Sequence, residues 1–294
     1  MWKTMLAVMI MFAGSSVMAQ EHTYAEGIEL ARAERVARLA QPLGWLSLVG
    51  LNWIEPGRHS IGRADDNAIV LAIGPAHLGE IVREGEQVSL ELAEDSNARV
   101  DGKPASGVVQ LVPDTLGAPT VVSFDEGRRN FNLIVRSGHY GLRVRDSQAT
   151  TRTQFAGIDF YPPDESWRVH ARFEPHPPGT TIPIANVVGQ LEDTPNLGTV
   201  TFERDGKTHR LEALEEDGTL FFVFADRTSG KDTYGAGRQL NAPMPTGSEA
   251  IIDFNLAYNP PCAFNAYSTC PLPPPENRLD LAVTAGEKKY RGAH

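Results

Sequence analysis

Residues 199–225 read TVTFERDGKTHRLEALEEDGTLFFVFA. Three short runs in this stretch alternate in polarity or are rich in β-branched and aromatic residues: Thr199–Arg204, Thr208–Leu214 and Leu220–Ala225. Each run predicts a β-strand, because this pattern suits a pleated surface with a buried face, and the Asp and Gly residues between the runs favour turns. The stretch therefore predicts consecutive strands.

Similar runs extend from this stretch in both directions. Arg168–Phe173 and Thr181–Val187 precede it, and Ala250–Phe254 and Leu279–Ala285 follow it. The first half of the chain has seven more runs: Trp45–Trp53, Ala68–Ile73, Val88–Leu92, Val108–Val112, Thr120–Phe124, Asn132–Arg136 and Tyr140–Val144. Short strands at this spacing are typical of β-sandwiches and barrels, and a parallel βαβ sheet lacks the helices it needs. We expect a mainly β protein with two β-sandwich or barrel-like modules.

One segment has a helical pattern. From Tyr24 to Ala40, apolar residues fall near one face of a helix and Arg and Glu on the others. A polar stretch at 146–166, broken by two prolines, suggests a boundary between two β modules. The predicted organisation is a signal peptide (1–19), an N-terminal helix (20–40), an N-terminal β module (41–150) and a C-terminal β module (151–294). A single continuous β structure is the alternative.

The first residues predict export. Lys3 precedes an apolar run from Met5 to Ala13, and small residues follow up to Ala19. This is the pattern of a signal peptide cleaved before Gln20, which predicts a periplasmic or extracellular protein; an uncleaved N-terminal anchor is the alternative. No later stretch of about 18 apolar residues suggests a membrane span.

Composition limits the partners. The 294 residues are 41% hydrophobic, enough for a sizeable core, and carry a formal net charge of −10. An acidic chain is a poor partner for nucleic acid or anionic lipid, so we expect neither.

Residues 253–279 read DFNLAYNPPCAFNAYSTCPLPPPENRL, and we call them the proline-rich tail. Proline presets φ and removes backbone donors, while Asn side chains bond nearby backbone, so this composition predicts a rigid, hydrogen-bonded loop. It contains both cysteines of the chain, Cys262 and Cys270. In an exported protein they are expected to form a disulfide. A zinc site is the weaker reading, because no histidine lies nearby in sequence.

Several segments carry a resemblance to a known family. They are Trp45–Leu51, Leu142–Asp146, Phe224–Arg238, the proline-rich tail, and Ala285–Lys288. Together they resemble the domain-of-unknown-function 1684 family of exported bacterial proteins, over nearly the whole chain that follows the signal peptide. The resemblance implies no particular activity. It does imply that the segments Asp226–Arg238 and Asp253–Asn277 belong together.

Polar residues in these two segments suggest a pocket at the rim of the C-terminal module. If the tail folds back over the strand ends, one concave site could gather Asp226, Thr233, Tyr234, Arg238, Asp253, Asn255, Tyr258, Asn259 and Asn277. The alternative is a structural clasp, in which Arg238 pairs with Asp226 or Asp253 and the asparagines satisfy buried backbone groups.

Two hypotheses for catalytic residues have less support in the sequence than the pocket does. Ser229, His170 and Asp253 could form a nucleophile, base and orienting acid, but Ser229 lacks the Gly-x-Ser-x-Gly elbow. Asp226 and Asp253 could act as a carboxylate pair for glycoside cleavage. His170 lies in an alternating run, where a histidine more often makes an interior polar contact.

The N-terminal module is distantly similar to a forkhead-associated β-sandwich. The similarity rests on Ser60–Arg63, Gly74–His77 and Ser96-Asn97. That family reads phosphothreonine, but Gly74 and Asn97-Ala98 depart from its pattern, so only a sandwich shape is expected.

No phosphate loop, Rossmann fingerprint or zinc pair suggests a cofactor. The sequence thus predicts binding of a small polar or sugar-like ligand of the cell envelope. A hydrolase using His170 with Asp226 or Asp253 is the alternative, and a pure scaffold is the third reading.

Overall fold

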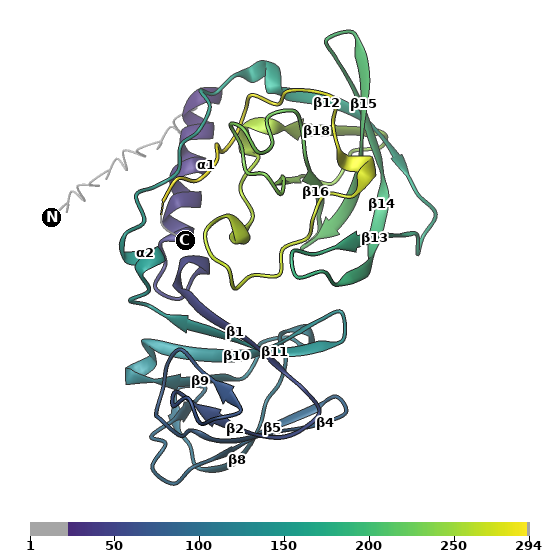
Figure 1. Ribbon diagram of the computed structural model, residues 1–294. Coiled ribbons are helices and arrows are strands. Elements are labelled where there is room, and N and C mark those ends of the chain that lie inside the picture. Colours follow the sequence, from purple (N-terminus) through teal and green to yellow (C-terminus); the bar gives the residue numbers. More distant parts are fainter. Residues whose placement is uncertain (1–22, 293–294) are drawn as a thin grey trace, which may run out of the picture.

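The computed structural model describes residues 23–292, so the predicted signal peptide lies outside the described range. The protein is mainly β with one long helix near its N-terminus, which confirms the predicted fold class (Figure 1). That helix, α1 (Tyr24–Leu39), begins at a capping box in which Thr23 and Glu26 satisfy each other's free backbone N–H groups. No helix in residues 23–292 is long and apolar enough to cross a membrane.

The N-terminal module consists of two sheets that enclose one core. The first has the order β1-β11-β10-β9-β6-β7 and the second β3-β2-β4-β5-β8. Alternating strand residues, including Ile81, Leu90, Leu133 and Val144, point between the sheets and are fully buried. In order along the chain, the strands are β1 (Leu48–Ile54), β2 (Gly57–Gly62), β3 (Ile69–Val70), β4 (Gly79–Glu84), β5 (Gln87–Leu92), β6 (Arg99–Val100), β7 (Lys103–Pro104), β8 (Gly107–Gln110), β9 (Val121–Phe124), β10 (Arg129–Arg136) and β11 (His139–Asp146).

The C-terminal module is a seven-stranded sheet curved into a half-barrel. Its order is β17-β16-β15-β14-β12-β18, and β13 pairs with β14. Val200 on β14 lies opposite Leu211 on β15, and both belong to an aromatic-rich core inside the curve. The strands are β12 (Arg168–Pro175), β13 (Thr181–Ala185), β14 (Leu191–Arg204), β15 (Lys207–Glu216), β16 (Thr219–Phe224), β17 (Arg238–Ala242) and β18 (Glu249–Asp253).

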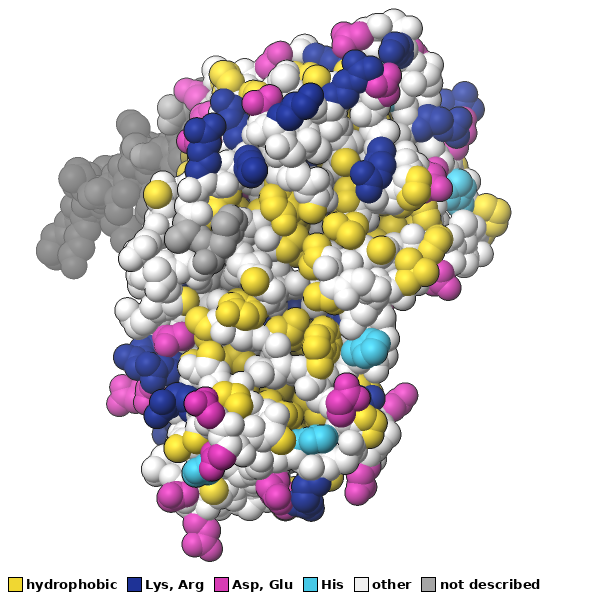
Figure 2. Space-filling view, viewed as in Figure 1, with side chains coloured by type: hydrophobic (Ala, Val, Ile, Leu, Met, Phe, Trp, Pro, Cys, Tyr) yellow, Lys and Arg dark blue, Asp and Glu magenta, His cyan; other side chains and the backbone are white. Residues whose placement is uncertain are grey.

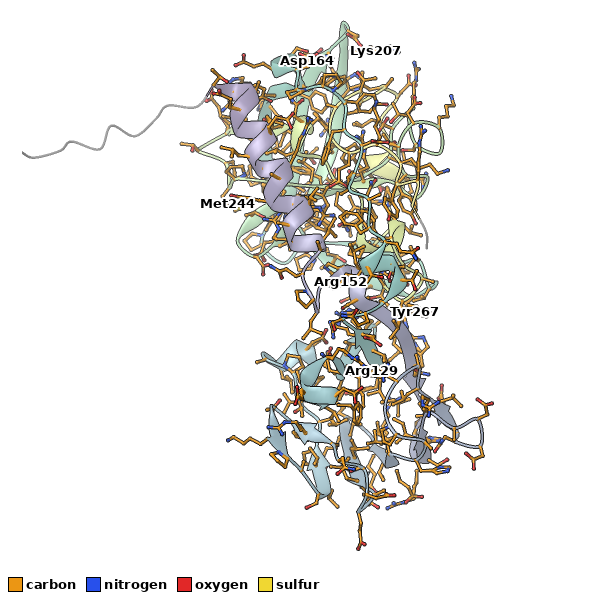
Figure 3. The ribbon with its side chains drawn as sticks, turned by 90° about the vertical axis from the view of Figure 1, so that its left-hand side faces the viewer. Arg129, Arg152, Asp164, Lys207, Met244 and Tyr267 are labelled. Atoms are coloured by element: carbon orange, nitrogen blue, oxygen red, sulfur yellow. The ribbon has the colours of Figure 1, made fainter. Side chains whose placement is uncertain are left out.

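The long helix precedes the N-terminal module in sequence but packs on the C-terminal module (Figure 1). The Tyr24 hydroxyl donates to Asp253 at 2.9 Å, and Arg35 Nε donates to Glu287 at 3.1 Å. Arg152, at the junction of the two modules in Figure 3, donates to the Ala40 carbonyl at 3.0 Å. Arg152 lies on the short helix α2 (Thr150–Thr153) in the segment that connects the modules.

The proline-rich tail crosses the side of the C-terminal module that faces the N-terminal module (Figure 1). It contains three single 3₁₀ turns, η5 (Phe254–Leu256), η6 (Pro261–Ala263) and η7 (Pro275–Asn277). A small apolar cluster packs its Phe264 against the end of α1 and the 3₁₀ turn η1 (Trp45–Ser47). Isolated bridges, such as Gln239 to Tyr258, pair it with the strands. The tail is therefore held on both sides, as its composition predicts. The remaining 3₁₀ turns are η2 (Asp114–Leu116), η3 (Asp125–Gly127) and η4 (Glu165–Trp167).

Side-chain types are unevenly distributed over the surface. In the face shown in Figure 2, charged side chains concentrate at the two ends of the molecule, and hydrophobic side chains gather where the modules meet.

Candidate functional site

Asp226 and Arg238, both predicted to line a pocket, form a fully buried ion pair. Arg238 Nη2 donates to Asp226 Oδ2 at 2.9 Å, and neither side chain has exposed surface. The guanidinium also donates to the carbonyls of Ala285 and Val283, which belong to the segment after the proline-rich tail. Burial lowers the pKa of Arg238, and the carboxylate of Asp226 acts in the opposite direction. This pair fastens the end of the chain to the half-barrel and leaves no opening for a ligand.

The turn after Asp226 is closed by its own hydroxyl groups. Asp226 Oδ1 accepts from Thr228 Oγ1 at 2.6 Å, and the hydroxyls of Thr228 and Thr233 lie 2.8 Å apart. Ser229 Oγ accepts from the backbone N–H of Asp226 at 3.1 Å. These hydroxyls therefore stabilise the turn.

Asp253 and Asn255 attach the start of the tail to α1. Asp253 accepts from the Tyr24 hydroxyl, and Asn255 Nδ2 donates to the Asp164 carbonyl at 2.8 Å. Burial raises the pKa of Tyr24, and the neighbouring carboxylate of Asp253 raises it further.

The side-chain amides of Asn259 and Asn277 also donate hydrogen bonds to backbone carbonyls. Asn259 Nδ2 donates to the Lys288 carbonyl at 2.8 Å. Asn277 Nδ2 donates to the carbonyls of Glu212 and Val223, each at 3.0 Å. Tyr234 donates to the Cys262 carbonyl at 3.1 Å. The nine predicted pocket residues thus surround the tail but do not line one common cavity, and of them only Tyr258 lines the largest cavity described below.

The residues of the proposed nucleophilic triad are not brought into contact. His170 lies on the outer, exposed face of β12, not in an interior polar contact as its alternating run suggests. Among the described residues, no hydrogen bond or ion pair joins His170 to Ser229, Asp226 or Asp253. Asp226 is also sealed by Arg238, so it has no free face for a substrate.

The predicted disulfide is absent from the structure. Cys262 and Cys270 are both free, although they are neighbours: the Cys262 N–H donates to Cys270 Sγ at 3.2 Å. Hydrogen bonds rather than a covalent link fix the loop between the two cysteines. Asn265 Nδ2, within this loop, donates to the carbonyls of Trp45 and Pro261, each at 3.1 Å. Within residues 23–292, no group of three or more His, Cys, Asp or Glu side chains is placed to hold a metal ion.

The main cavity lies elsewhere, where the two modules, α1 and the tail meet. It has a volume of about 590 Å³, and we call it the junction cavity. Both modules, α1 and the tail contribute residues to its wall. The lining residues are Arg35, Arg38, Trp45, Arg136, Arg143, Glu216, Asp217, Gln239, Asn241, Tyr258, Pro261 and residues 268–271.

Arg143 is the most unusual side chain of this wall. It projects from β11 and is 5% exposed, yet its Nε has no hydrogen-bond partner among the described residues. One Nη donates weakly to Thr269 Oγ1 at 3.4 Å, and the guanidinium lies 5.0 Å from the centre of the Trp45 ring. Burial, with Arg136 and Arg145 nearby, lowers the pKa of Arg143 to about 10, so the group is cationic at neutral pH. Ser268 Oγ is also buried in this wall, beside the thiol of Cys270.

Three more arginines line the junction cavity. Arg136 is held by Asp114 at 2.7 Å, and Arg35 lies 4.8 Å from the centre of the Tyr258 ring. Arg38, on the last turn of α1, is exposed, and no described residue forms a hydrogen bond or ion pair with its guanidinium. Of the four arginines, Arg136 and Arg35 are paired with carboxylates, whereas Arg38 and Arg143 form no ion pair among the described residues. These two cations and the two aromatic rings suit an anion that carries a flat or apolar part.

Two smaller hollows share walls with the junction cavity. One of about 240 Å³ shares Arg35, Arg38, Asn241 and Tyr258 with it. The other, of about 250 Å³, shares Arg136, Glu216, Thr269 and Pro271. The three hollows together form a groove along the junction.

Sequence reasoning identified Tyr258 but missed the arginines. A signal was available on β11, where Arg143 and Arg145 alternate with the buried Leu142 and Val144. Arginines at every second position predict a polar face opposite the core face. Nothing local indicates that this face meets another module.

Comparisons with known proteins agree with the predicted family. The model of the family described as "Protein of unknown function (DUF1684)" matches residues 153–288. Among solved structures, an uncharacterised protein of Haloarcula marismortui is similar at 35% identity and a TM-score of 0.39. That similarity covers 47% of this chain and 78% of the archaeal one. No curated protein matches. The chain therefore belongs to the DUF1684 family.

Proposed function

We propose that the protein binds a small anionic ligand in the junction cavity. The observation that carries the proposal is the buried, cationic Arg143 in the cavity wall, which pairs with no carboxylate of the described residues and makes one weak hydrogen bond, to Thr269. A buried charge without a counter-charge is costly, and an anionic ligand in the cavity would supply one to Arg143. The predicted small polar ligand thus becomes an anionic one, held at the junction of the modules rather than at the rim of the C-terminal module.

The surroundings of Arg143 support an anion over a neutral sugar. Arg38, which forms no ion pair with a described residue, adds positive charge to the same wall of a chain whose formal net charge is −10. Ser268 and Thr269 place hydroxyl groups beside Arg143. Guanidinium and hydroxyl donors together bind phosphate or carboxylate oxygens, and the Trp45 and Tyr258 rings offer surface to the rest of the ligand.

The test is isothermal titration calorimetry of the purified protein with phosphate, sulfate, citrate, glucose 6-phosphate and glucose. At least one anion should bind, and glucose 6-phosphate should bind more tightly than glucose. The variant Arg143→Met should weaken anion binding by about 10- to 100-fold, the range expected for loss of a charge-assisted hydrogen bond. Higher salt should also weaken binding.

Arg83→Met is the matched control. Arg83 also lies over an aromatic ring, 4.4 Å from the centre of Tyr140, but outside the groove. The Arg83→Met variant should bind the anion with an affinity within about two-fold of that of the original protein. If no anion binds, or if both variants weaken binding equally, the proposal fails and a scaffold becomes the better reading.

Export remains part of the proposal, since it rests on Lys3 and the apolar run before Gln20, outside the described residues. N-terminal sequencing of the protein from its host's envelope fraction should begin at Gln20. A chain that begins at Met1 in the cytoplasm would contradict export but not anion binding.

A further inference from the structure

The junction cavity is not uniformly basic. Glu216 and Asp217, from the turn between β15 and β16, line the same wall as Arg143. The adjoining hollow of about 250 Å³ adds Glu192 and Glu215. One end of the groove therefore carries four carboxylates together with Arg136 of β10, which is paired with Asp114, and the other arginines lie toward α1 and β11.

These carboxylates do not neutralise the arginines. Within the described part of the chain, none of the four forms an ion pair. Arg136 is paired with Asp114 and Arg35 with Glu287, both outside the cavity wall. Two sets of opposite charge thus face one cavity without contact between them.

One hydrogen-bonded chain holds the acidic side in place. Tyr258 Oη donates to Asn241 Oδ1 at 2.6 Å, and Asn241 Nδ2 donates to Glu216 Oε2 at 3.1 Å. The ring of Tyr258 contacts the Arg35 guanidinium on the basic side. Asn241 and Tyr258 therefore separate and orient the two charged regions.

We propose that the ligand of the junction cavity carries an amino group as well as its anionic group. The anion would lie against Arg143, Ser268 and Thr269, and the ammonium group against Glu216 and Asp217. This inference rests on the proposed anion binding and specifies the ligand class: an amino-bearing phosphate or carboxylate, such as an amino sugar phosphate. A ligand of this class gives the buried guanidinium a counter-charge, and its ammonium group complements the exposed carboxylates of Glu216 and Asp217.

Straight-chain ω-aminoalkyl phosphates with two to eight carbons test the inference, each compared by calorimetry with the alkyl phosphate of equal length. The alkyl chain is varied in length because the distance between the anion-binding and ammonium-binding positions is not assumed. At one length the amino compound should bind at least about five-fold more tightly than its alkyl partner. The double variant Glu216→Gln/Asp217→Asn should bring the two affinities within about two-fold of each other.

Asp205→Asn is the matched control for the turn. Asp205 and Asp217 both precede a Gly in a strand-connecting turn with positive φ, 53° and 49°, and Asp205 lies outside the groove. This control should keep the five-fold preference. If alkyl phosphates bind and no amino compound binds more tightly, the inference fails while the proposed function stands. If neither series binds, both fail.

Discussion

Two buried arginines of this protein differ in the counter-charge that the fold gives them. Each lies over an aromatic ring and has an unsatisfied Nε, but Arg238 also has a carboxylate at 2.9 Å and backbone carbonyls from the end of the chain. Arg143, at the wall of a cavity, has one weak hydrogen bond and no carboxylate partner among the described residues. Burial alone does not distinguish a structural arginine from a binding one. The distinction lies in whether the fold itself supplies the partners.

The largest expected effect is the loss of stability in Arg238→Met. The variant leaves Asp226 buried without its counter-charge, which should lower the free energy of unfolding by about 3–5 kcal/mol. Arg143→Met should change it by less than about 1 kcal/mol or increase it, because that guanidinium is buried without a full set of partners. Urea unfolding followed by circular dichroism measures both values.

A third variant keeps this comparison testable if Arg238→Met does not fold. Asp226→Leu/Arg238→Met removes both charges and should recover part of the stability, because no unpaired charge remains. Equal destabilisation by Arg143→Met and Arg238→Met would show that the two arginines do the same structural work, and the comparison would collapse.

A smaller effect is expected from Glu287, which links the buried cluster to Arg35 in the cavity wall. Burial raises the pKa of Glu287, although Arg35 and the Asn259 N–H favour its charged form. A carboxyl with a raised folded pKa binds its proton more strongly in the folded state. Its contribution is therefore full below the unfolded pKa, near 4.3, and is lost as the pH rises through the folded pKa.

The variant Glu287→Gln removes this titration. The stability of the original protein relative to the variant should fall between pH 4 and pH 8, by about 1.4 kcal/mol for each unit by which the folded pKa is raised. Urea midpoints measured across this range test the sign. A difference that grows with pH would mean that Arg35 dominates, and that the Glu287 pair stabilises the cavity wall.

The sequence predicted the elements better than the site. Runs such as Leu220–Ala225 identify strands because their pattern is local. The strands β2, β4, β6, β7 and β17 were missed, and the run Leu279–Ala285, predicted as a strand, forms none. Residues 238–242, RQLNA, show no apolar strand pattern because Arg238 and Gln239 are polar, yet both are buried. Their partners, Val283 and the Tyr258 backbone, come from the tail and the end of the chain. A polar strand buried by distant partners has no local signature.

The site was harder to predict for the same reason. The predicted pocket residues follow the tail because their composition is unusual there, and most of them satisfy backbone groups of that tail. Arg35, Arg143 and Glu216 look like ordinary surface charges, and only the packing of two modules brings them to one cavity. Their roles depend on contacts between residues far apart in sequence.

The attachment of α1 to the C-terminal module has a consequence for synthesis. Arg35 is separated from Glu287 by 252 positions, and Tyr24 from Asp253 by 229. The ribosome therefore makes the helix early and completes its docking surface last, after the intervening N-terminal sandwich has had time to fold. Until then one face of the helix lacks its partner, which makes the nascent chain, rather than the finished protein, the form most in need of a chaperone.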